Sequence, residues 1–267
     1  MFEEYISPFI LAVLQGISEF LPISSSGHLV LLNALFETDK GLLFDLVLHL
    51  ATLISVVVFY WRDICSIFSG CVHEIKGGAE KTNLKFVAYL LVATAITGVI
   101  GIGLNDWVET QFRDVLIVGI LLILNAGILW SSRWKRFFPL TDGALTLKTA
   151  AIIGLAQGLA VLPGISRSGS TITAALLMGV APKDCAKISF LLSIPVILGA
   201  VLLHIWDLSQ LDMHNLVVVG LAAIVAAVVG YVSLVMLDKV LKKANFHHFA
   251  PYCLIVGCIA MIASLLG

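Results

Sequence analysis

The chain has 267 residues, of which 60% are hydrophobic and only 12% are charged, and its formal net charge is −1. Ordinary globular domains are about 45–50% apolar and about 25% charged, so a mean hydropathy of +1.04 excludes a soluble fold of this length. The composition predicts an all-α polytopic membrane protein of one domain, 1–267. The small negative charge argues against nucleic acid as a partner.

The first apolar region, residues 5–36, is interrupted in its middle by Pro, Ser and Gly. As one straight helix it would be about 48 Å long at 1.5 Å per residue, whereas a hydrocarbon core is about 30 Å thick. Each half alone is too short to cross. We therefore expect a re-entrant helix–break–helix hairpin over 5–36, with its break facing a cavity rather than lipid.

Six uninterrupted apolar runs follow that are long enough to cross a bilayer as helices. They lie at 44–61, 86–104, 115–131, 186–206, 215–237 and 249–266. A second interrupted region, 149–181, resembles the first and predicts a second re-entrant hairpin. The expected architecture is six transmembrane helices plus two hairpins.

The loop charges distinguish this topology from one in which both interrupted regions cross. If both return to the side that they entered from, one side holds 13 Lys and Arg residues, and only Lys40 and Arg113 lie on the other, a ratio of 13 to 2. If both cross, the ratio is 8 to 7. Cytoplasmic loops carry the excess of Lys and Arg, so the re-entrant topology is favoured, with both termini outside. The 13 residues are Arg62, Lys76, Lys81, Lys85, Arg133, Lys135, Arg136, Lys148, Lys183, Lys187, Lys239, Lys242 and Lys243.

The two breaks resemble each other. QGISEFLPISSSGH, beginning at Gln15, aligns without a gap with QGLAVLPGISRSGS, beginning at Gln157, at an offset of 142 residues. We interpret this as an inverted-topology repeat of 1–131 and 149–267, an architecture whose sites form where broken helices meet; chance similarity of two Ser/Gly-rich breaks is the alternative. The offset pairs Ser25 with Arg167, so we expect these two residues to lie close together.

Arg167 is the only basic residue outside the predicted loops. A charge at that depth costs about 2.5–3.5 kcal/mol on insertion scales and usually marks a function. Neighbouring hydroxyls, two glycines and the N-terminus of a half-helix complete the pattern of a phosphate-binding cradle. The alternative is a packing seam of small residues in which Arg167 pairs with Glu19 for structure alone.

The first break supplies groups suited to catalysis. Ser25 is a candidate nucleophile, and His28, three residues later on the opening turn of a half-helix, is a candidate base that can lean back toward the hydroxyl. The alternative for His28 is a purely structural role. Glu19 is placed to orient His28 or to hold a divalent cation, and Gln15 shares its helical face. Asp45 and His49 form a further pair that either lines the entrance or solvates a helix end.

These motifs resemble those of a known family, the undecaprenyl-pyrophosphate phosphatases of the bacitracin-resistance type. QGISE at 15–19 is similar to that family's Glu/Gln-xxx-Glu motif, and PGISRSGST at 163–171 matches its PGxSRSxxT motif at every fixed position. PISSSGH places Ser25 and His28 where the family has its essential Ser and His. Because the first motif begins with Gln15 here, a metal site built from two carboxylates is in doubt.

The resemblance implies release of the terminal phosphate of undecaprenyl pyrophosphate at the plasma (inner) membrane, which recycles the lipid carrier of cell-wall synthesis. It implies that Ser25 is the nucleophile or positions water, that His28 is the general base or acid, and that Glu19 orients His28 or binds Mg²⁺ or Ca²⁺. Arg167 would hold the pyrophosphate. The other candidate contacts to the substrate are Gln15, Ser24, Ser26, Gly27, Gly164, Ser166, Ser168, Gly169 and Thr171.

A flippase or transporter of a phosphorylated lipid or small anion is the competing interpretation, because inverted repeats with broken helices are common in transporters. The group formed by Ser25, His28 and Glu19 distinguishes the two, since transport does not need it. The sequence leaves open whether a phosphoseryl intermediate forms, which cation is preferred, whether two copies form a homodimer and which prenyl chain lengths are accepted.

Overall fold

The computed structural model describes residues 5–37, 41–78, 80–111, 114–137, 145–204, 216–242 and 246–266. Within these ranges the chain is helical, without a strand. The helices of the first half are α1 (Ser7–Ser18), α2 (Ser25–Phe36), α3 (Gly41–Phe59), α4 (Trp61–Ile75), α5 (Thr82–Gln111), α6 (Val115–Ser131) and the 3-10 helix η2 (Ser132–Phe137). Those of the second half are α7 (Leu147–Leu159), α8 (Arg167–Leu177), α9 (Pro182–Leu203), α11 (Leu216–Lys242), the 3-10 helix η4 (Phe246–Phe249) and α12 (Ala250–Leu266).

Within the described residues, five helices are long and apolar enough to cross a membrane, namely α5, α6, α9, α11 and α12. A sixth span is reached if α3 and α4 count as one, and these two helices are bent by 71° at their junction. The interrupted regions form shorter apolar helices instead: α1 and α2 flank the first break, and α7 and α8 flank the second. The prediction of an all-helical multi-pass membrane protein is thus confirmed. Of the predicted loop cations, Lys40, Arg113 and Lys243 lie outside the described residues.

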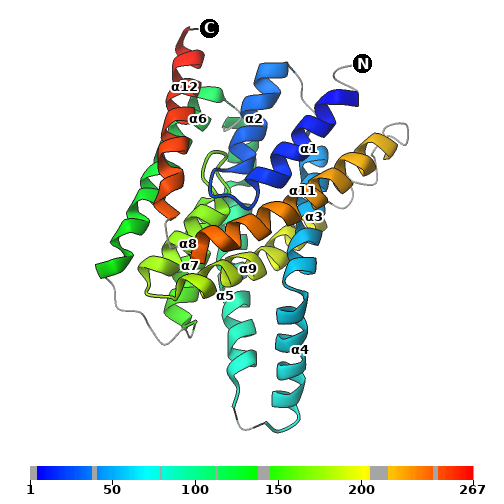
Figure 1. The fold of residues 1–267 in the computed structure, drawn as a ribbon, viewed down its shortest axis with the longest axis vertical. Helices are drawn as coiled ribbons and strands as arrows, with labels where there is room; N and C mark the ends of the chain where they lie inside the picture. Colours follow the sequence, from blue (N-terminus) through cyan, green and yellow to red (C-terminus); the bar gives the residue numbers. More distant parts are fainter. Residues whose placement is uncertain are drawn as a thin grey trace.

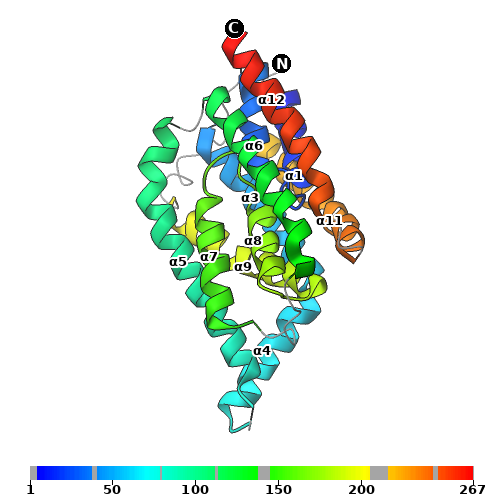
Figure 2. The same cartoon turned by 90° about the vertical axis from the view of Figure 1, so that its left-hand side faces the viewer.

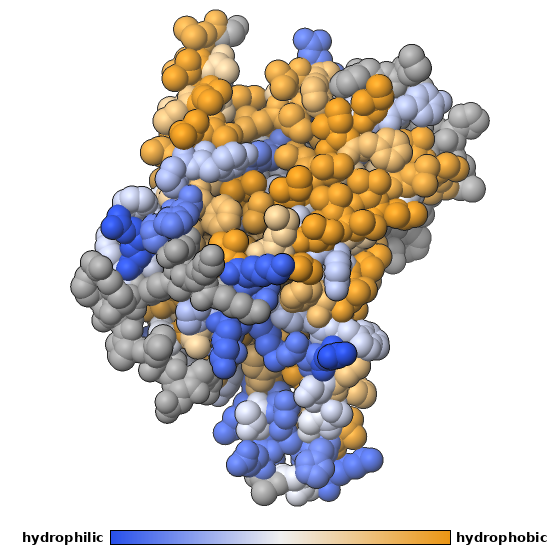
Figure 3. Space-filling model, in the orientation of Figure 1, coloured by the Kyte–Doolittle hydropathy of each residue, from blue (hydrophilic) through white to orange (hydrophobic). Residues whose placement is uncertain are grey.

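The polar and apolar parts of the molecule separate along its length. In Figure 1, α4 and the start of α5 project as a hairpin from the lower end, while α1 begins and α12 ends at the upper end. Figure 3 shows apolar side chains over the upper part of this face and polar ones around the hairpin. The Glu74 carboxylate closes the hairpin, because it accepts hydrogen bonds from the backbone N–H groups of Asn83 (2.8 Å) and Leu84 (2.9 Å) at the start of α5.

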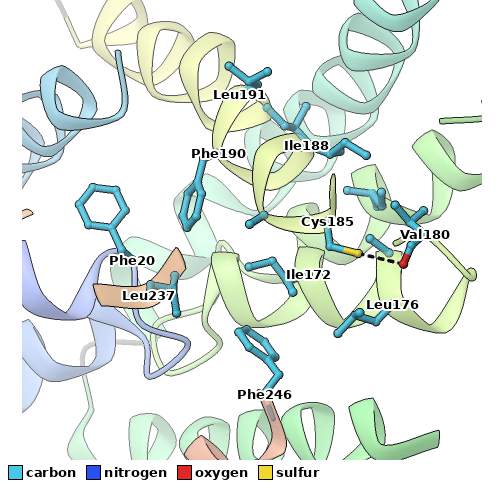
Figure 4. Close-up of a cluster of buried hydrophobic side chains, with 14 of the residues drawn as sticks. Phe20, Ile172, Leu176, Val180, Cys185, Ile188, Phe190, Leu191, Leu237 and Phe246 are labelled. Atoms are coloured by element: carbon cyan, nitrogen blue, oxygen red, sulfur yellow. Dashed lines mark hydrogen bonds between the residues drawn. The ribbon is translucent and has the colours of Figure 1, made fainter. Parts of the chain in front are cut away.

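The largest apolar core holds the first break against the second half of the chain (Figure 4). Phe20, within the first break, is fully buried, and its ring meets the edge of Phe190 on α9 at a centroid distance of 5.6 Å. Ile172 on α8, Leu237 on α11 and Phe246 on η4 belong to the same cluster. The break is therefore anchored by close packing of apolar side chains, which stabilises helix contacts in a membrane.

Helices α6 and α12 run along each other, as Figure 2 shows, at a crossing built from glycines. A methyl group on Gly119 would lie 3.0 Å from the carbonyl oxygen of Gly257, and one on Gly257 would lie 2.7 Å from that of Gly119. Only residues without a side chain allow the two backbones to approach this closely, which is how many membrane helices associate. Gly127, on the same α6, has open space around it.

We expect Gly119→Ala to destabilise the protein, because the added methyl group forces α6 and α12 apart, and overpacking of this kind costs about 1–3 kcal/mol. Gly127→Ala is the matched control and should leave stability unchanged or raise it, since a helical glycine costs about 0.5–1 kcal/mol relative to alanine. Thermal unfolding of the detergent-solubilised variants measures both. Equal melting temperatures for the two variants would contradict the assigned crossing.

Candidate functional site

The half-helix that follows each break begins with a serine cap. Ser24 caps α2 by accepting a hydrogen bond from the backbone N–H of Gly27 (3.3 Å), and Ser166 caps α8 by accepting one from that of Gly169 (3.1 Å). The two serines are separated by the same 142-residue offset that aligns the breaks. A helix start leaves backbone N–H groups without intrahelical partners and carries a partial positive charge. Both helix starts can therefore favour an anion.

The two breaks are bonded to each other. The Ser24 hydroxyl also accepts a hydrogen bond from the backbone N–H of Gly164 (3.1 Å). This contact needs unusual backbone at both residues, since φ is 71° at Ser24 and 113° at Gly164. Gly27 lies against Gly164 so closely that a methyl group on it would be 2.9 Å from the Gly164 Cα atom. Gly27 and Gly164 thus lie where the two hairpins meet.

Asn125 on α6, which the sequence did not single out, holds both breaks. Its amide nitrogen donates to the carbonyl oxygen of Pro22 (3.1 Å), and its amide oxygen accepts from the backbone N–H of Ser166 (3.0 Å). The side chain is fully buried. The sequence offered only the presence of an asparagine within an apolar run, which does not indicate the segments that its amide contacts.

A cavity of about 540 Å³ lies between the breaks, α3 and α9. Its apolar wall includes Leu29, Val30, Leu46, Val196 and Ile197. The polar side chains around it are Ser18, Glu19, Ser24, Ser25, Ser26, Asn33, Asp45, His49, Ser166, Arg167 and His204. Polar groups from both halves of the chain therefore converge on one space, with an apolar wall beside them.

Glu19 is the centre of this polar group and is only 6% exposed. One carboxylate oxygen, Oε1, accepts a hydrogen bond from Arg167. The other, Oε2, accepts from the Ser25 hydroxyl (2.7 Å) and from the amide of Gln15 (3.0 Å). Because Ser25 and Arg167 contact the same carboxylate, the expectation that they lie close together is confirmed.

Arg167 is the first residue of α8, and among the described residues that line the cavity it is the only Lys or Arg. Its Nη2 pairs with Glu19, whereas its Nη1 is buried and has no hydrogen-bond partner among the described residues. A buried donor without a partner costs about 1–3 kcal/mol. An oxygen atom of a bound ligand would relieve that cost, so Arg167 can bind a ligand through Nη1 while its Nη2 pairs with Glu19.

His28 lies differently from the expectation that it leans toward Ser25. Its Nδ1 is 2.8 Å from the backbone carbonyl oxygen of Ser24, and its Nε2 is 2.9 Å from the hydroxyl of Tyr252 on α12. The two rings stack, with a 7° angle between their planes. The helical spacing from Ser25 allowed a contact with the hydroxyl, but the ring turns toward α12. Tyr252, from a distant part of the chain, gave no signal in the sequence.

Asp45 and His49 both line the cavity, which favours the first of the two roles left open for them. The His49 Nε2 atom lies 3.5 Å from the Oε2 atom of Glu19, and its Nδ1 is 2.7 Å from the backbone carbonyl oxygen of Asp45. Glu19 was expected to orient His28, and the structure instead brings it next to His49.

The remaining predicted contacts divide into two groups. Ser24, Ser26 and Ser166 line the cavity. The others lie behind its wall: the Ser168 hydroxyl donates to the Leu21 carbonyl oxygen (3.3 Å), and that of Thr171 is 2.6 Å from the Ser189 hydroxyl on α9. The members of this second group are Gln15, Gly27, Gly164, Ser168, Gly169 and Thr171.

The donor set around Glu19 does not fit a metal site formed by the protein alone. No three His, Cys, Asp or Glu side chains of the described residues converge closely enough to hold an ion. The Glu19 carboxylate already accepts from a guanidinium, a hydroxyl and an amide. A divalent cation bound to it would also stand beside the positive charge of Arg167.

The sequence was compared with protein families and with curated proteins. The chain matches the bacitracin resistance protein BacA family over residues 8–259. It is 42% identical to an undecaprenyl-diphosphatase of Methanosphaera stadtmanae, over 98% of this chain and 99% of the relative. It is 39% identical to undecaprenyl-diphosphatase 2 of Bacillus thuringiensis, over 95% of each chain, and 38% identical to an undecaprenyl-diphosphatase of Desulforapulum autotrophicum, over 97% of this chain and 98% of the relative. The chain therefore belongs to the BacA family.

Proposed function

We propose that this protein is an undecaprenyl-diphosphatase, which hydrolyses undecaprenyl pyrophosphate to undecaprenyl phosphate and inorganic phosphate and so recycles the lipid carrier of cell-wall synthesis. The observation that carries the proposal is the convergence of Arg167, Ser25 and Glu19 on one cavity with an apolar wall. Relatives covering nearly the whole chain bear the same name.

Arg167 and the starts of α2 and α8 hold the pyrophosphate in this proposal. A guanidinium binds phosphate oxygens through parallel N–H donors, and the two helix starts add partial positive charge on the same side. The hydroxyls of Ser24, Ser26 and Ser166 line the same space. The apolar wall receives the first part of the prenyl chain, and the rest stays in lipid.

Ser25 and Glu19 carry out the attack. The Ser25 hydroxyl donates to Oε2 of Glu19 over 2.7 Å, so this carboxylate is placed to accept a proton from Ser25 or from a water molecule that Ser25 positions. The attacking oxygen bonds to the terminal phosphorus, and the bond from that phosphorus to the bridging oxygen breaks. If the attacking oxygen is that of Ser25, water then hydrolyses the phosphoseryl group, which releases inorganic phosphate and restores the hydroxyl. The electron pair leaves on undecaprenyl phosphate, and Arg167 offsets the charge that develops.

A divalent cation, Mg²⁺ or Ca²⁺, would enter this site only with the substrate. Pyrophosphate oxygens and water would be its ligands, since a hard cation prefers oxygen and Glu19 is already engaged with Arg167. The cation would neutralise phosphate charge when bound.

The arrangement of the helices supports the re-entrant topology and the repeat. In Figure 1, α1 starts and α2 ends at the upper end, with their break lower in the molecule. Helix pairs also occur in equivalent sets at the 142-residue offset: α5 packs on α7 as α11 packs on α1, and α3 packs on α11 as α9 packs on α5. We assign 1–131 and 149–267 as inverted repeats in the plasma membrane, with both termini and the cavity opening on the extracytoplasmic side.

Arg167→Lys should reduce phosphate release about 10²–10³-fold, the usual cost of removing one preorganised charge-stabilising donor, because an ammonium cannot make the bidentate contact. Arg133→Lys is the matched control, since Arg133 is exposed and lies over the Trp130 ring. The assay is phosphate release from undecaprenyl pyrophosphate by purified protein in detergent. Near-normal turnover by Arg167→Lys would refute its role, and wild type that binds the lipid without releasing phosphate would favour a flippase.

Chelation of divalent cations should lower phosphate release, whereas calorimetric titration of Mg²⁺ into the protein without substrate should give no saturable heat. Both follow if the cation is carried by the pyrophosphate. Saturable binding of Mg²⁺ that Glu19→Gln abolishes would show a site on the protein instead.

The topology is tested by single cysteines in a variant lacking the five native ones. Glu80→Cys and Lys183→Cys, both at exposed positions, should resist an impermeant thiol reagent in intact cells, because a re-entrant α7–α8 hairpin leaves them on the same inner side. Glu37→Cys should react as the outward-facing control. Reaction of Lys183→Cys but not Glu80→Cys would mean that the α7–α8 region crosses the membrane.

A further inference from the structure

Two histidines near the first break are held in the same way. The Nδ1 atom of His28 lies 2.8 Å from the Ser24 carbonyl oxygen, and that of His49 lies 2.7 Å from the Asp45 carbonyl oxygen. A carbonyl oxygen only accepts, so in both rings Nδ1 carries the hydrogen atom. What each histidine can do therefore depends on its Nε2 atom.

The Nε2 atom of His28 contacts α12 and does not face the cavity. It lies 2.9 Å from the Tyr252 hydroxyl, and the two rings stack. The Ser24 carbonyl that His28 binds belongs to the residue that caps α2 and that has a φ of 71°. His28 is therefore built to fix the start of α2, and so the position of Ser25, rather than to reach the reacting atoms.

The Nε2 atom of His49 points into the site. His49 lines the cavity, 27% of its side chain is exposed, and Nε2 lies 3.5 Å from Oε2 of Glu19. The same Oε2 atom accepts the hydrogen bond of Ser25 at 2.7 Å. Ser25, Glu19 and His49 thus lie one after another between the attacking hydroxyl and an imidazole nitrogen at the cavity wall.

We propose that His49 is the proton acceptor behind Glu19, and that His28 is a positioning residue for α2. When the attacking oxygen bonds to phosphorus, its proton moves to Oε2 of Glu19 and then to Nε2 of His49. The electron pair of the broken bridging bond leaves on undecaprenyl phosphate, and the imidazolium returns its proton to water in the cavity. This inference rests on the proposed phosphatase function.

Several other groups near His49 could also shape a pH profile. Glu19 faces it from the end of α1, Arg167 from α8 and His204 from the end of α9, while Asp45 lies one turn earlier on α3. Among the described side chains of α11, which also packs on α3, the charged Asp238 and Lys239 lie toward its far end, near Tyr60. The test must therefore separate His49 from the groups in the cavity.

The test is the pH dependence of phosphate release by purified protein, with kcat and KM determined separately. Wild type should lose activity as the pH falls, because a protonated His49 cannot accept. His49→Gln should lower kcat about 10²-fold, the lower end for acid–base catalysis, leave KM within about twofold and abolish this loss at low pH. His28→Gln, Asp45→Asn and His204→Gln should keep it, and His73→Gln on α4 is the external control.

Rescue by free imidazole distinguishes proton transfer from a structural role. His49→Ala should regain activity with added imidazole, because the lost ring faced an open cavity, whereas His28→Ala should not. The assignment would be overturned if the loss of activity at low pH persisted in His49→Gln, or if it disappeared in His28→Gln, Asp45→Asn or His204→Gln. It would also be overturned if imidazole did not rescue a folded His49→Ala. Wild type that releases no phosphate at any pH would overturn the proposed function and this inference together.

Discussion

The buried carboxylate of Glu19 constrains this structure more than any other group. A carboxylate taken out of water costs several kcal/mol unless it is paired and hydrogen-bonded, and removing one partner of a buried pair typically costs about 3–5 kcal/mol. Glu19 meets this requirement through Arg167, Ser25 and Gln15. Because Arg167 belongs to the other half of the chain, the pairing holds only if the two breaks lie against each other.

The rest of the site follows from that requirement. Breaks that meet must bring their backbones close, which explains why glycines face each other at 27 and 164 and why the Ser24 hydroxyl accepts from the Gly164 N–H group. Their unpaired backbone groups need partners where no water is available, and Asn125 supplies two of them. The ion pair of Glu19 with Arg167, the contact between the glycines and the hydrogen bonds of Asn125 together hold the starts of α2 and α8 beside one cavity.

The sequence predicted that the two breaks lie close together, because the spacing between similar motifs showed which residues are equivalent. The 142-residue offset paired Ser25 with Arg167, and both contact Glu19. The same reasoning failed for His28, because a spacing of three residues on a helix gives a shared face but not the direction in which the ring turns. That direction is set by Tyr252, 224 residues further along the chain. Asn125 and the contact between His49 and Glu19 are likewise products of helix packing, which local pattern does not specify.

The difference between the two breaks explains how the proposed repeat would form the proposed reactive centre. Equivalent residues at the 142-residue offset include both cap serines, Ser24 and Ser166, so a serine side chain caps both helices, although φ is 71° at Ser24 and −78° at Ser166. The next position differs: Ser25 bears a hydroxyl and Arg167 a guanidinium, and the two share one carboxylate. Two serines there would leave Glu19 without a counter-charge, and two arginines would leave no hydroxyl group for the proposed attack. The asymmetry therefore supplies both the stability of the buried charge and the chemistry that the charge supports.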